Sequence, residues 1–215
     1  MDARTVQVLL EKTKKRNFVQ TYELIVNLKS IYDLKKPENR IVDYVELPKG
    51  RGKKIRIGAV VGPELEKAAK SIFDEVITKD ELPEITKRRG KEFAKRNYHI
   101  VAQVSVMPLL GRYLGKYLGP RKKMPNPKYG MIIPDNANEQ MLQALYNKLQ
   151  KLVRVCVDKH LTFGIPVGTE SMPIEDVLEN INHVLNWLYN RIPGGKQMIK
   201  SIYLKLTMGP SIKIF

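Results

Sequence analysis

Near-continuous apolar segments in the middle of the chain constrain its fold more than any other feature. Residues 55–61 are almost entirely apolar and lead through Gly62-Pro63 into a segment whose apolar residues have helical spacing. The same unit recurs at 98–106, which a predicted helix over 108–118 follows. Strands that are apolar on both faces and alternate with helices are typical of a parallel sheet covered on both sides. The middle of the chain is therefore predicted to be an α/β unit.

A short strand and an amphipathic helix complete this unit. The strand is predicted at 131–133. The apolar face of the helix that follows consists of Met141, Leu142, Leu145 and Leu149. We expect this face to pack against the sheet.

The two ends of the chain show a different pattern, in which apolar and polar residues alternate. In a strand predicted from Phe18 onward, the apolar face consists of Tyr22, Leu24, Val26 and Leu28. The polar face of this strand carries Thr21, Glu23 and Asn27. A strand predicted over 199–207 has a polar face made of Ser201, Tyr203, Lys205 and Thr207. Because successive side chains of a strand point to opposite faces, each strand can pack on one face and touch a ligand with the other.

Helical patterns accompany the terminal strands. Val6, Leu9 and Leu10 have helical spacing, with Asp2 as the predicted cap, and another helix is predicted to start after Pro173. Strand and helix at both ends, around a central α/β unit, predict that the ends fold together into one α+β domain. The predicted domains are 1–54 with 154–215, and an α/β insertion at 55–153. Turn formers and cations from Pro48 to Lys54 mark the first junction.

The charge balance indicates what kind of partner the chain has. Its 38 Lys and Arg exceed its 22 Asp and Glu, which gives a formal net charge of +16 and argues for a polyanion. With 43% apolar residues, the composition is that of a folded protein. Cys156 is the only cysteine, so we interpret it as a core residue in a cytoplasmic protein without internal disulfides. No stretch resembles a signal peptide or a membrane helix, and we expect a soluble protein without a membrane partner.

The most basic loop extends from Leu118 to Lys128. Three prolines limit its conformational freedom and predict an exposed, non-helical segment. The cations that it is predicted to display are Arg121, Lys122, Lys123 and Lys128. Phosphate is the commonest polyanionic partner of such a cluster, and the alternative is a solvated loop that aids solubility.

Catalytic and metal-binding patterns are missing from the sequence. The three histidines His99, His160 and His183 are scattered, and no His, Cys and carboxylate cluster has zinc spacing. Cys156 and His160 lack an orienting partner and are not a nucleophile and base. Residues 111–116 lack the spacing of a phosphate-binding loop. We therefore predict no catalytic residue, no metal and no cofactor.

Several segments resemble the L-one family of large-subunit ribosomal proteins, in its archaeal or bacterial form. Residues 114–128 resemble a family signature, and the six residues from Phe18 resemble its Phe-x-x-Thr-x-Glu strand. Leu47-Pro-Lys-Gly resembles the turn into an inserted domain, and Ile165-Pro-Val-Gly the return strand. The final segment contains the Thr207-Met-Gly ending. These segments occur in family order and span nearly the whole chain.

The resemblance implies a fold and a function. The implied fold is a discontinuous RNA-binding domain with a Rossmann-like α/β domain inserted between two hinges. The implied function is binding of ribosomal RNA at the base of a mobile side stalk near the tRNA exit site of the cytoplasmic ribosome. It also implies repression of translation through the protein's own mRNA, contact with exit-site tRNA, and a monomer when free.

The resemblance also implies which residues contact RNA. They are Phe18, Thr21, Glu23, Ser201, Thr207, Met208 and Gly209. A-form RNA displays 2′-hydroxyls in a shallow minor groove, which short hydroxyl side chains and backbone groups can read. Gly209 would allow a close approach of the backbone, and Phe18 and Met208 could lie against ribose or a base.

Asn17, Glu23 and the basic loop each carry a separate expectation. Asn17 stands where relatives commonly have lysine, and Lys15 and Arg16 are expected to replace the lost phosphate contact. Glu23 must accept a hydrogen bond from RNA or orient a cation, because a bare carboxylate near phosphate is unfavourable. The basic loop belongs to the inserted domain in the family, so its cations are expected to make an auxiliary RNA or tRNA contact.

Two alternative functions follow from the same residues. An α/β enzyme that binds nucleotides or phosphorylated metabolites would be compatible with the middle unit, by analogy of fold alone. A basic protein that coats nucleic acid without selectivity would account for the charge.

Overall fold

The computed structural model describes residues 3–215, which form two compact units. The first contains the residues up to Lys53 together with Lys151–Phe215, and the second is Lys54–Gln150. Both ends of the chain therefore build one unit, and a single continuous segment builds the other. Asp2, predicted as a helix cap, lies outside the described residues.

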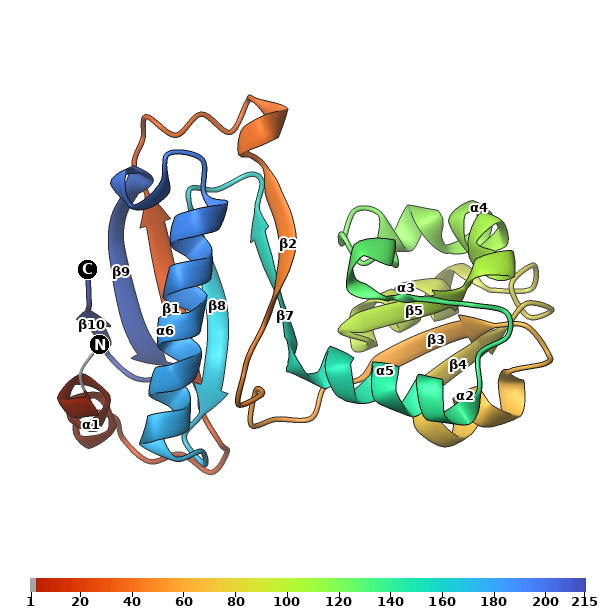
Figure 1. Ribbon diagram of the computed structural model, residues 1–215, viewed down its shortest axis with the longest axis horizontal. Coiled ribbons are helices and arrows are strands. Elements are labelled where there is room, and N and C mark those ends of the chain that lie inside the picture. Colours follow the sequence, from red (N-terminus) through yellow and green to blue (C-terminus); the bar gives the residue numbers. More distant parts are fainter. Residues whose placement is uncertain (1–2) are drawn as a thin grey trace. The chain divides into compact units, whose positions relative to one another are not determined.

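The first unit contains a four-stranded antiparallel sheet with the strand order β10-β9-β1-β8. Its strands are β1 (Thr21–Leu28), β8 (Thr162–Thr169), β9 (Ile199–Leu206) and β10 (Ser211–Lys213). The helix α6 (Ile174–Arg191) lies along one face of this sheet (Figure 1). The shorter helix α1 (Ala3–Lys12) contacts α6 and β10.

Alternating side chains explain how this sheet packs. Along β1 every second residue is buried, as the sequence pattern predicts, and the apolar face joins one core with α6. That core includes Leu24, Val26, Leu204, Ile181 and Leu188. The other face of the sheet carries the half-buried and polar side chains, so it is the face on which a ligand could bind.

A two-stranded ribbon completes the first unit. It consists of β2 (Ile41–Glu46) and β7 (Leu152–Val157), which pair antiparallel. Cys156 lies on β7 opposite Val42, and Val42 is 40% exposed. Cys156 is half-buried here, so the prediction that it is a core residue is wrong. Strand alternation turns the side chain of Cys156 to the outer face of the ribbon, whereas the side chains of its neighbours Val155 and Val157 are turned inward.

The second unit is an α/β unit, as predicted. Its parallel sheet has the order β4-β3-β5-β6, with β3 (Ile57–Val61), β4 (Glu75–Thr78), β5 (His99–Gln103) and β6 (Ile132–Ile133). Figure 1 shows helices on both faces of this sheet. They are α2 (Glu66–Ile72), α3 (Lys87–Arg96), α4 (Met107–Leu118) and α5 (Glu139–Lys151). Every residue of β3 and β5 is buried, which explains their continuous apolar sequences.

Two elements of this unit escaped the sequence analysis, β4 and α3. The strand β4 has only four residues, too few for a period to show. The helix α3 is dominated by cations and buries only Gly90, Phe93 and Ala94. Gly90 lies against the ring of Tyr117, where any side chain would collide with the aromatic ring. On α5, Met141 is 50% exposed, and Tyr146 joins Leu142 and Leu149 on the buried face in its place.

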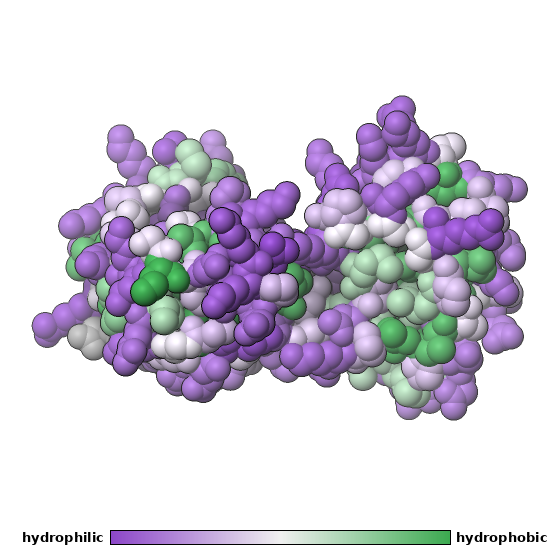
Figure 2. All heavy atoms as spheres, turned by 90° about the horizontal axis from the view of Figure 1, so that it is seen from above, coloured by the Kyte–Doolittle hydropathy of each residue, from purple (hydrophilic) through white to green (hydrophobic). Residues whose placement is uncertain are grey.

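Hydrophilic side chains dominate the face seen in Figure 2, in keeping with the high charge of the chain. Within residues 3–215, no three His, Cys, Asp or Glu side chains gather where they could hold a metal ion. In the same range, no helix combines the length and the apolar character needed to cross a membrane.

Candidate nucleic-acid interface

The candidate interface is the seam between β1 and β9 on the sheet face turned away from α6. The two strands pair from Tyr22 opposite Leu206 to Asn27 opposite Ser201. Segments about 180 residues apart in sequence are thereby placed side by side. Glu23 and Lys205 face each other across the seam, so the carboxylate has an opposite charge beside it.

Thr21 and Thr207 are brought together at one end of the seam. The backbone N–H of Thr21 donates to the hydroxyl of Thr207 at 3.1 Å, and the N–H of Thr207 donates to the carbonyl of Thr21 at 3.1 Å. Thr207 lies just beyond β9, which ends at Leu206, although the sequence pattern extended the strand to Thr207. Its hydroxyl therefore continues the ladder by one step beyond the strand.

Gln20 holds this end of the seam together, and sequence reasoning missed it. Its side-chain oxygen accepts from the N–H of Met208 at 3.1 Å, and its backbone N–H donates to Glu170 at 3.0 Å. It is completely buried, although it follows exposed residues. A single glutamine outside the strand pattern gives no sequence signal, because its role depends on partners about 150 and 188 residues away.

Gly209 is required by packing within the protein. A Cβ at this position would lie 2.5 Å from the hydroxyl of Thr13 and 3.2 Å from Cβ of Leu206. The turn after β9 therefore fits closely against the end of α1. The sequence analysis assigned this glycine to the approach of RNA, and the structure adds a contact inside the chain that by itself excludes a side chain.

Exposed apolar side chains flank this end of the seam. Phe18 is 51% exposed and Met208 is 59% exposed. The strand β1 begins at Thr21, so the prediction that it starts at Phe18 is wrong. Phe18 lies in the loop two residues before Gln20, whose side chain binds the backbone of Met208.

A hollow of about 400 Å³ lies beside this end of the seam. Its lining includes Lys15 and Arg16, together with Gln20 and Glu170. Lys15 and Arg16 are the cations expected to replace the lysine that relatives commonly have at position 17. They line the same hollow as Gln20, whose side chain binds the backbone of Met208. Positive charge at this position could meet a phosphate close to Thr207 and Met208.

Ser201 lies apart from the other predicted contacts. Six residues separate it from Thr207 along the chain, which corresponds to about 20 Å of strand. The residue is 7% exposed, and its hydroxyl accepts a hydrogen bond from the amide of Asn27 at 3.0 Å. The prediction of an open polar face is wrong for this residue. The predicted contacts therefore follow the seam as a stripe, with most of them at one end.

Comparisons with known proteins settle the family. The model of the ribosomal protein L1p/L10e family matches residues 10–210. The chain belongs to this family. It is 53% identical over 202 residues to the large ribosomal subunit protein uL1 of Nanoarchaeum equitans, covering 94% of this chain and 93% of the relative. It is 42% identical to the uL1 protein of Pyrococcus abyssi, covering 94% of this chain and 90% of the relative.

Membership of the L1p/L10e family excludes one of the two alternative functions, the enzyme. The uL1 protein of Methanocaldococcus jannaschii is also similar, at 40% identity over 98% of this chain and 93% of the relative. This family consists of structural proteins of the large ribosomal subunit and not of enzymes. The alternative of a nucleotide-binding α/β enzyme is therefore wrong, because an α/β unit alone does not imply catalysis.

Beneath the seam, the core side of β1 in this L1p/L10e-family chain carries a tyrosine, Tyr22, whose phenol does not titrate near neutral pH. Tyr22 is 1% exposed and follows Thr21 on the core side of β1. Burial, and to a smaller extent the nearby Glu170 carboxylate, raises the pKa of Tyr22 to about 12. The phenol therefore stays neutral in the pH range in which nucleic-acid binding would be measured.

The basic loop of the second unit is not displayed as a whole. Arg121 and Lys128 are exposed and Lys122 is half-buried. Lys123 is turned inward, and its ammonium group donates to the carbonyls of Ala94 and Asn97 at 2.8 and 2.5 Å. The prediction that all four cations are displayed is wrong for Lys123. It binds the carbonyls at the end of α3, where a cation is favoured by the helix dipole.

Lys123→Ala is expected to destabilise the second unit by about 1 to 2 kcal/mol, because two carbonyl groups lose a charged donor. Hydrogen–deuterium exchange measured by mass spectrometry should show faster exchange of the α3 amides. Lys128→Ala removes a cation from the same loop but not from α3, and it should leave this exchange unchanged. Equal exchange of α3 in wild type and Lys123→Ala would contradict the capping role.

Proposed function

We propose that this protein binds large-subunit ribosomal RNA specifically through the β1–β9 seam, at the base of the mobile side stalk near the tRNA exit site. The first unit is then the RNA-binding domain, predicted from sequence as 1–54 with 154–215. The contacts are Phe18, Thr21, Glu23, Ser201, Thr207, Met208 and Gly209. The observation that carries the proposal is the pair of hydrogen bonds that joins Thr21 to Thr207.

The chemistry of this end of the seam supports recognition of folded RNA. Thr207 offers a hydroxyl whose position is fixed by Thr21. Phe18 and Met208 add exposed apolar surface, on which a ribose or an unstacked base can lie. Lys15 and Arg16 supply charge for phosphate from the adjacent hollow. Short hydroxyls together with apolar groups favour contact with the sugar edges of RNA. Lysines alone would bind the phosphate backbone instead.

The same surface is proposed to repress translation by binding the protein's own mRNA. A messenger segment that folds into a similar helix junction would present the same 2′-hydroxyls to Thr21 and Thr207. Both RNAs would then compete for one site. Arg121, Lys122, Lys123 and Lys128 were expected to contact RNA or tRNA together, and the proposal keeps this auxiliary role for Arg121, Lys122 and Lys128.

A competition titration tests this function. The protein is bound to a stalk-derived ribosomal RNA and challenged with an unlabelled DNA duplex of the same length. The proposal expects binding to survive a large excess of DNA, while the leader of the protein's own mRNA displaces the ribosomal RNA. Equal competition by DNA would instead support a basic protein that coats nucleic acid without selectivity.

A further inference from the structure

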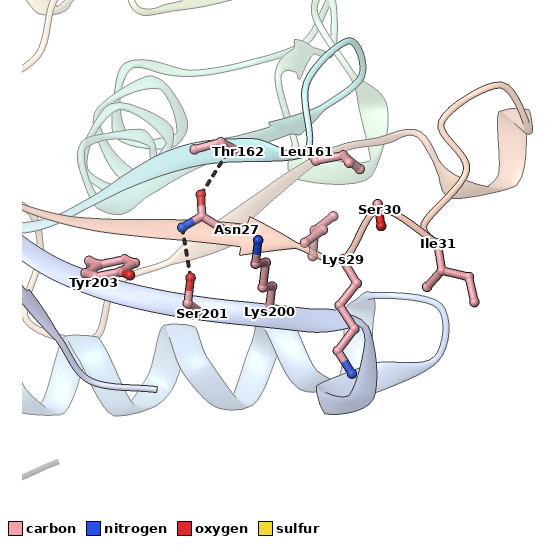
Figure 3. Close-up of a pocket in the computed structure, with 10 residues that line it drawn as sticks. Asn27, Lys29, Ser30, Ile31, Leu161, Thr162, Lys200, Ser201 and Tyr203 are labelled. Atoms are coloured by element: carbon pink, nitrogen blue, oxygen red, sulfur yellow. Dashed lines mark hydrogen bonds between the residues drawn. The ribbon is translucent and has the colours of Figure 1, made fainter.

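A groove lies at the opposite end of the seam from Thr207, around Asn27 and Ser201 (Figure 3). Its volume is about 790 Å³. The lining residues are Asn27, Leu28, Lys29, Ser30, Ile31, Leu161, Thr162, Lys200, Ser201 and Tyr203. None of these side chains is acidic and two are cationic, so the groove favours an anion.

A row of hydrogen bonds fixes the floor of this groove. The hydroxyl of Thr162 donates to the side-chain oxygen of Asn27 at 2.8 Å. The amide nitrogen of Asn27 donates to the hydroxyl of Ser201 at 3.0 Å. Figure 3 shows Asn27 between its two partners, which come from the neighbouring strands β8 and β9.

The direction of these bonds leaves donors for a ligand. An amide nitrogen carries two hydrogens, and one of those on Asn27 is used for Ser201. Since the oxygen of Ser201 accepts this bond, its own hydroxyl hydrogen is available to donate. The floor therefore offers donors held in place by the strands, which suits a phosphate, hydroxyl or carbonyl oxygen.

A β-bulge turns a cation toward the groove. The pairing of β1 with β9 shifts between Asn27 and Leu28, so that Ser201 and Ile199 have partners and Lys200 is left between them. A bulge of this kind changes the direction of a side chain and is typical of functional positions. In Figure 3 the side chain of Lys200 rises toward Asn27, although strict alternation would place it on the opposite face from Ser201.

Lys29 and Ile31 extend the groove beyond the strand end. Lys29 is exposed, and its backbone N–H is held by the carbonyl of Met198 at 2.9 Å. Ile31 is 75% exposed, an unusual degree for a large apolar side chain. Tyr203 lies one step further along the seam and supplies an aromatic ring. The groove thus combines cations, fixed donors and apolar surface, which are the groups that bind a nucleotide.

We propose that this groove is a second RNA subsite, which takes a phosphate and its ribose from the RNA bound along the seam. Lys29 and Lys200 neutralise the phosphate, Asn27 and Ser201 donate to ribose or base oxygens, and Tyr203 or Ile31 packs against the base. The inference rests on the proposed function, because the two subsites share the strands β1 and β9. It assigns RNA contacts to Asn27, Lys29, Lys200 and Tyr203. The sequence analysis placed Asn27 and Tyr203 on polar strand faces but named none of the four as an RNA contact.

The first test removes the two cations together. Lys29→Ala with Lys200→Ala should weaken binding of stalk-derived RNA about tenfold at low salt and make the slope of log affinity against log salt shallower by about 1.5. Lys35→Ala with Lys36→Ala is the matched control, because it removes the same charge from exposed lysines outside the groove. Equal effects of the two double variants would overturn the subsite.

The second test reverses the chemistry of the floor with little change of shape. Asn27→Asp replaces a donor by a carboxylate, which should repel phosphate, and it should weaken RNA binding about tenfold. Hydroxyl-radical protection of the bound RNA should be lost at a few nucleotides and kept elsewhere. Circular dichroism checks that the variant is folded, and Asn27→Ser, which keeps a small donor without the charge, should retain more affinity than Asn27→Asp.

The outcomes separate this inference from the proposed function. If wild-type protein does not bind the RNA selectively, the proposed function fails. If binding is selective and Thr207→Ala weakens it, while Asn27→Asp and the Lys29, Lys200 double variant match wild type, only the second subsite is overturned. Loss of the same protected nucleotides in both groove variants would support it.

Discussion

Replacing Asn180 by leucine is expected to lower the free energy of unfolding of the first unit by about 3 to 5 kcal/mol, because three backbone groups would be left without partners. The side chain of Asn180 is completely buried on α6. Its nitrogen donates to the carbonyls of Gly50 and Val167, both at 2.9 Å, and its oxygen accepts from the N–H of Lys49 at 3.0 Å. It thereby ties the segment after β2 to β8 and α6.

The single tryptophan allows this unit to be followed by itself. Trp187 lies on α6, so its fluorescence during urea unfolding reports on the first unit. Asn186→Leu is the matched control, since it makes the same change at an exposed position of the same helix. We expect the control to stay within about 0.5 kcal/mol of wild type. A change of less than about 1 kcal/mol for Asn180→Leu would show that water replaces these hydrogen bonds and that the clamp is weak.

Thr207→Ala and Phe18→Ala are each expected to weaken binding of stalk-derived RNA by about 1 to 3 kcal/mol, which is about 5- to 150-fold. Thr207→Ala removes the hydroxyl that accepts from the N–H of Thr21 and donates to the carbonyl of Thr21 at 3.4 Å, at the end of the seam proposed to contact RNA. Phe18→Ala removes an exposed ring that has no stabilising role in the core. A gel-shift titration at constant salt measures both.

Conservative and distant replacements control these two variants. Thr207→Ser keeps the hydroxyl and should bind RNA within a few-fold of wild type. Phe215→Ala removes another exposed phenylalanine of the same unit and should leave affinity unchanged. If both Thr207→Ala and Phe18→Ala bind the RNA as wild type does, the proposed face is rejected.

Sequence periodicity was sufficient for the main elements of the fold. The alternation along β1 assigned buried and open faces correctly, and the apolar runs of β3 and β5 predicted a parallel sheet. These predictions succeeded because the spacing of apolar residues along a strand depends directly on whether one or both of its faces are buried. The short strand β4 and the cationic helix α3 escaped, since few of their residues are buried apolar ones.

The candidate site could be predicted only in part. The resemblance to the family indicated Thr21, Thr207 and their neighbours as RNA contacts, and that assignment stays a prediction. Gln20 could not be found from sequence, because its partners Glu170 and Met208 lie far along the chain. Lys123 was misread for a similar reason. From sequence, a lysine beside prolines is expected to be exposed. Only the structure shows that the end of α3 lies beside Lys123.

The sequence by itself determined the class of each element, the excess of positive charge and membership of a ribosomal protein family, because these depend on local spacing, composition and ordered motifs. Tertiary structure alone decided which partner each polar group on the seam has. The hydroxyls of Ser201 and Thr207 belong to similar residues on one predicted face, yet one is buried against Asn27 and the other fixes the end of the ladder. Hydrogen bonds between distant segments make that difference, since each depends on where the strands and their bulges place the partner.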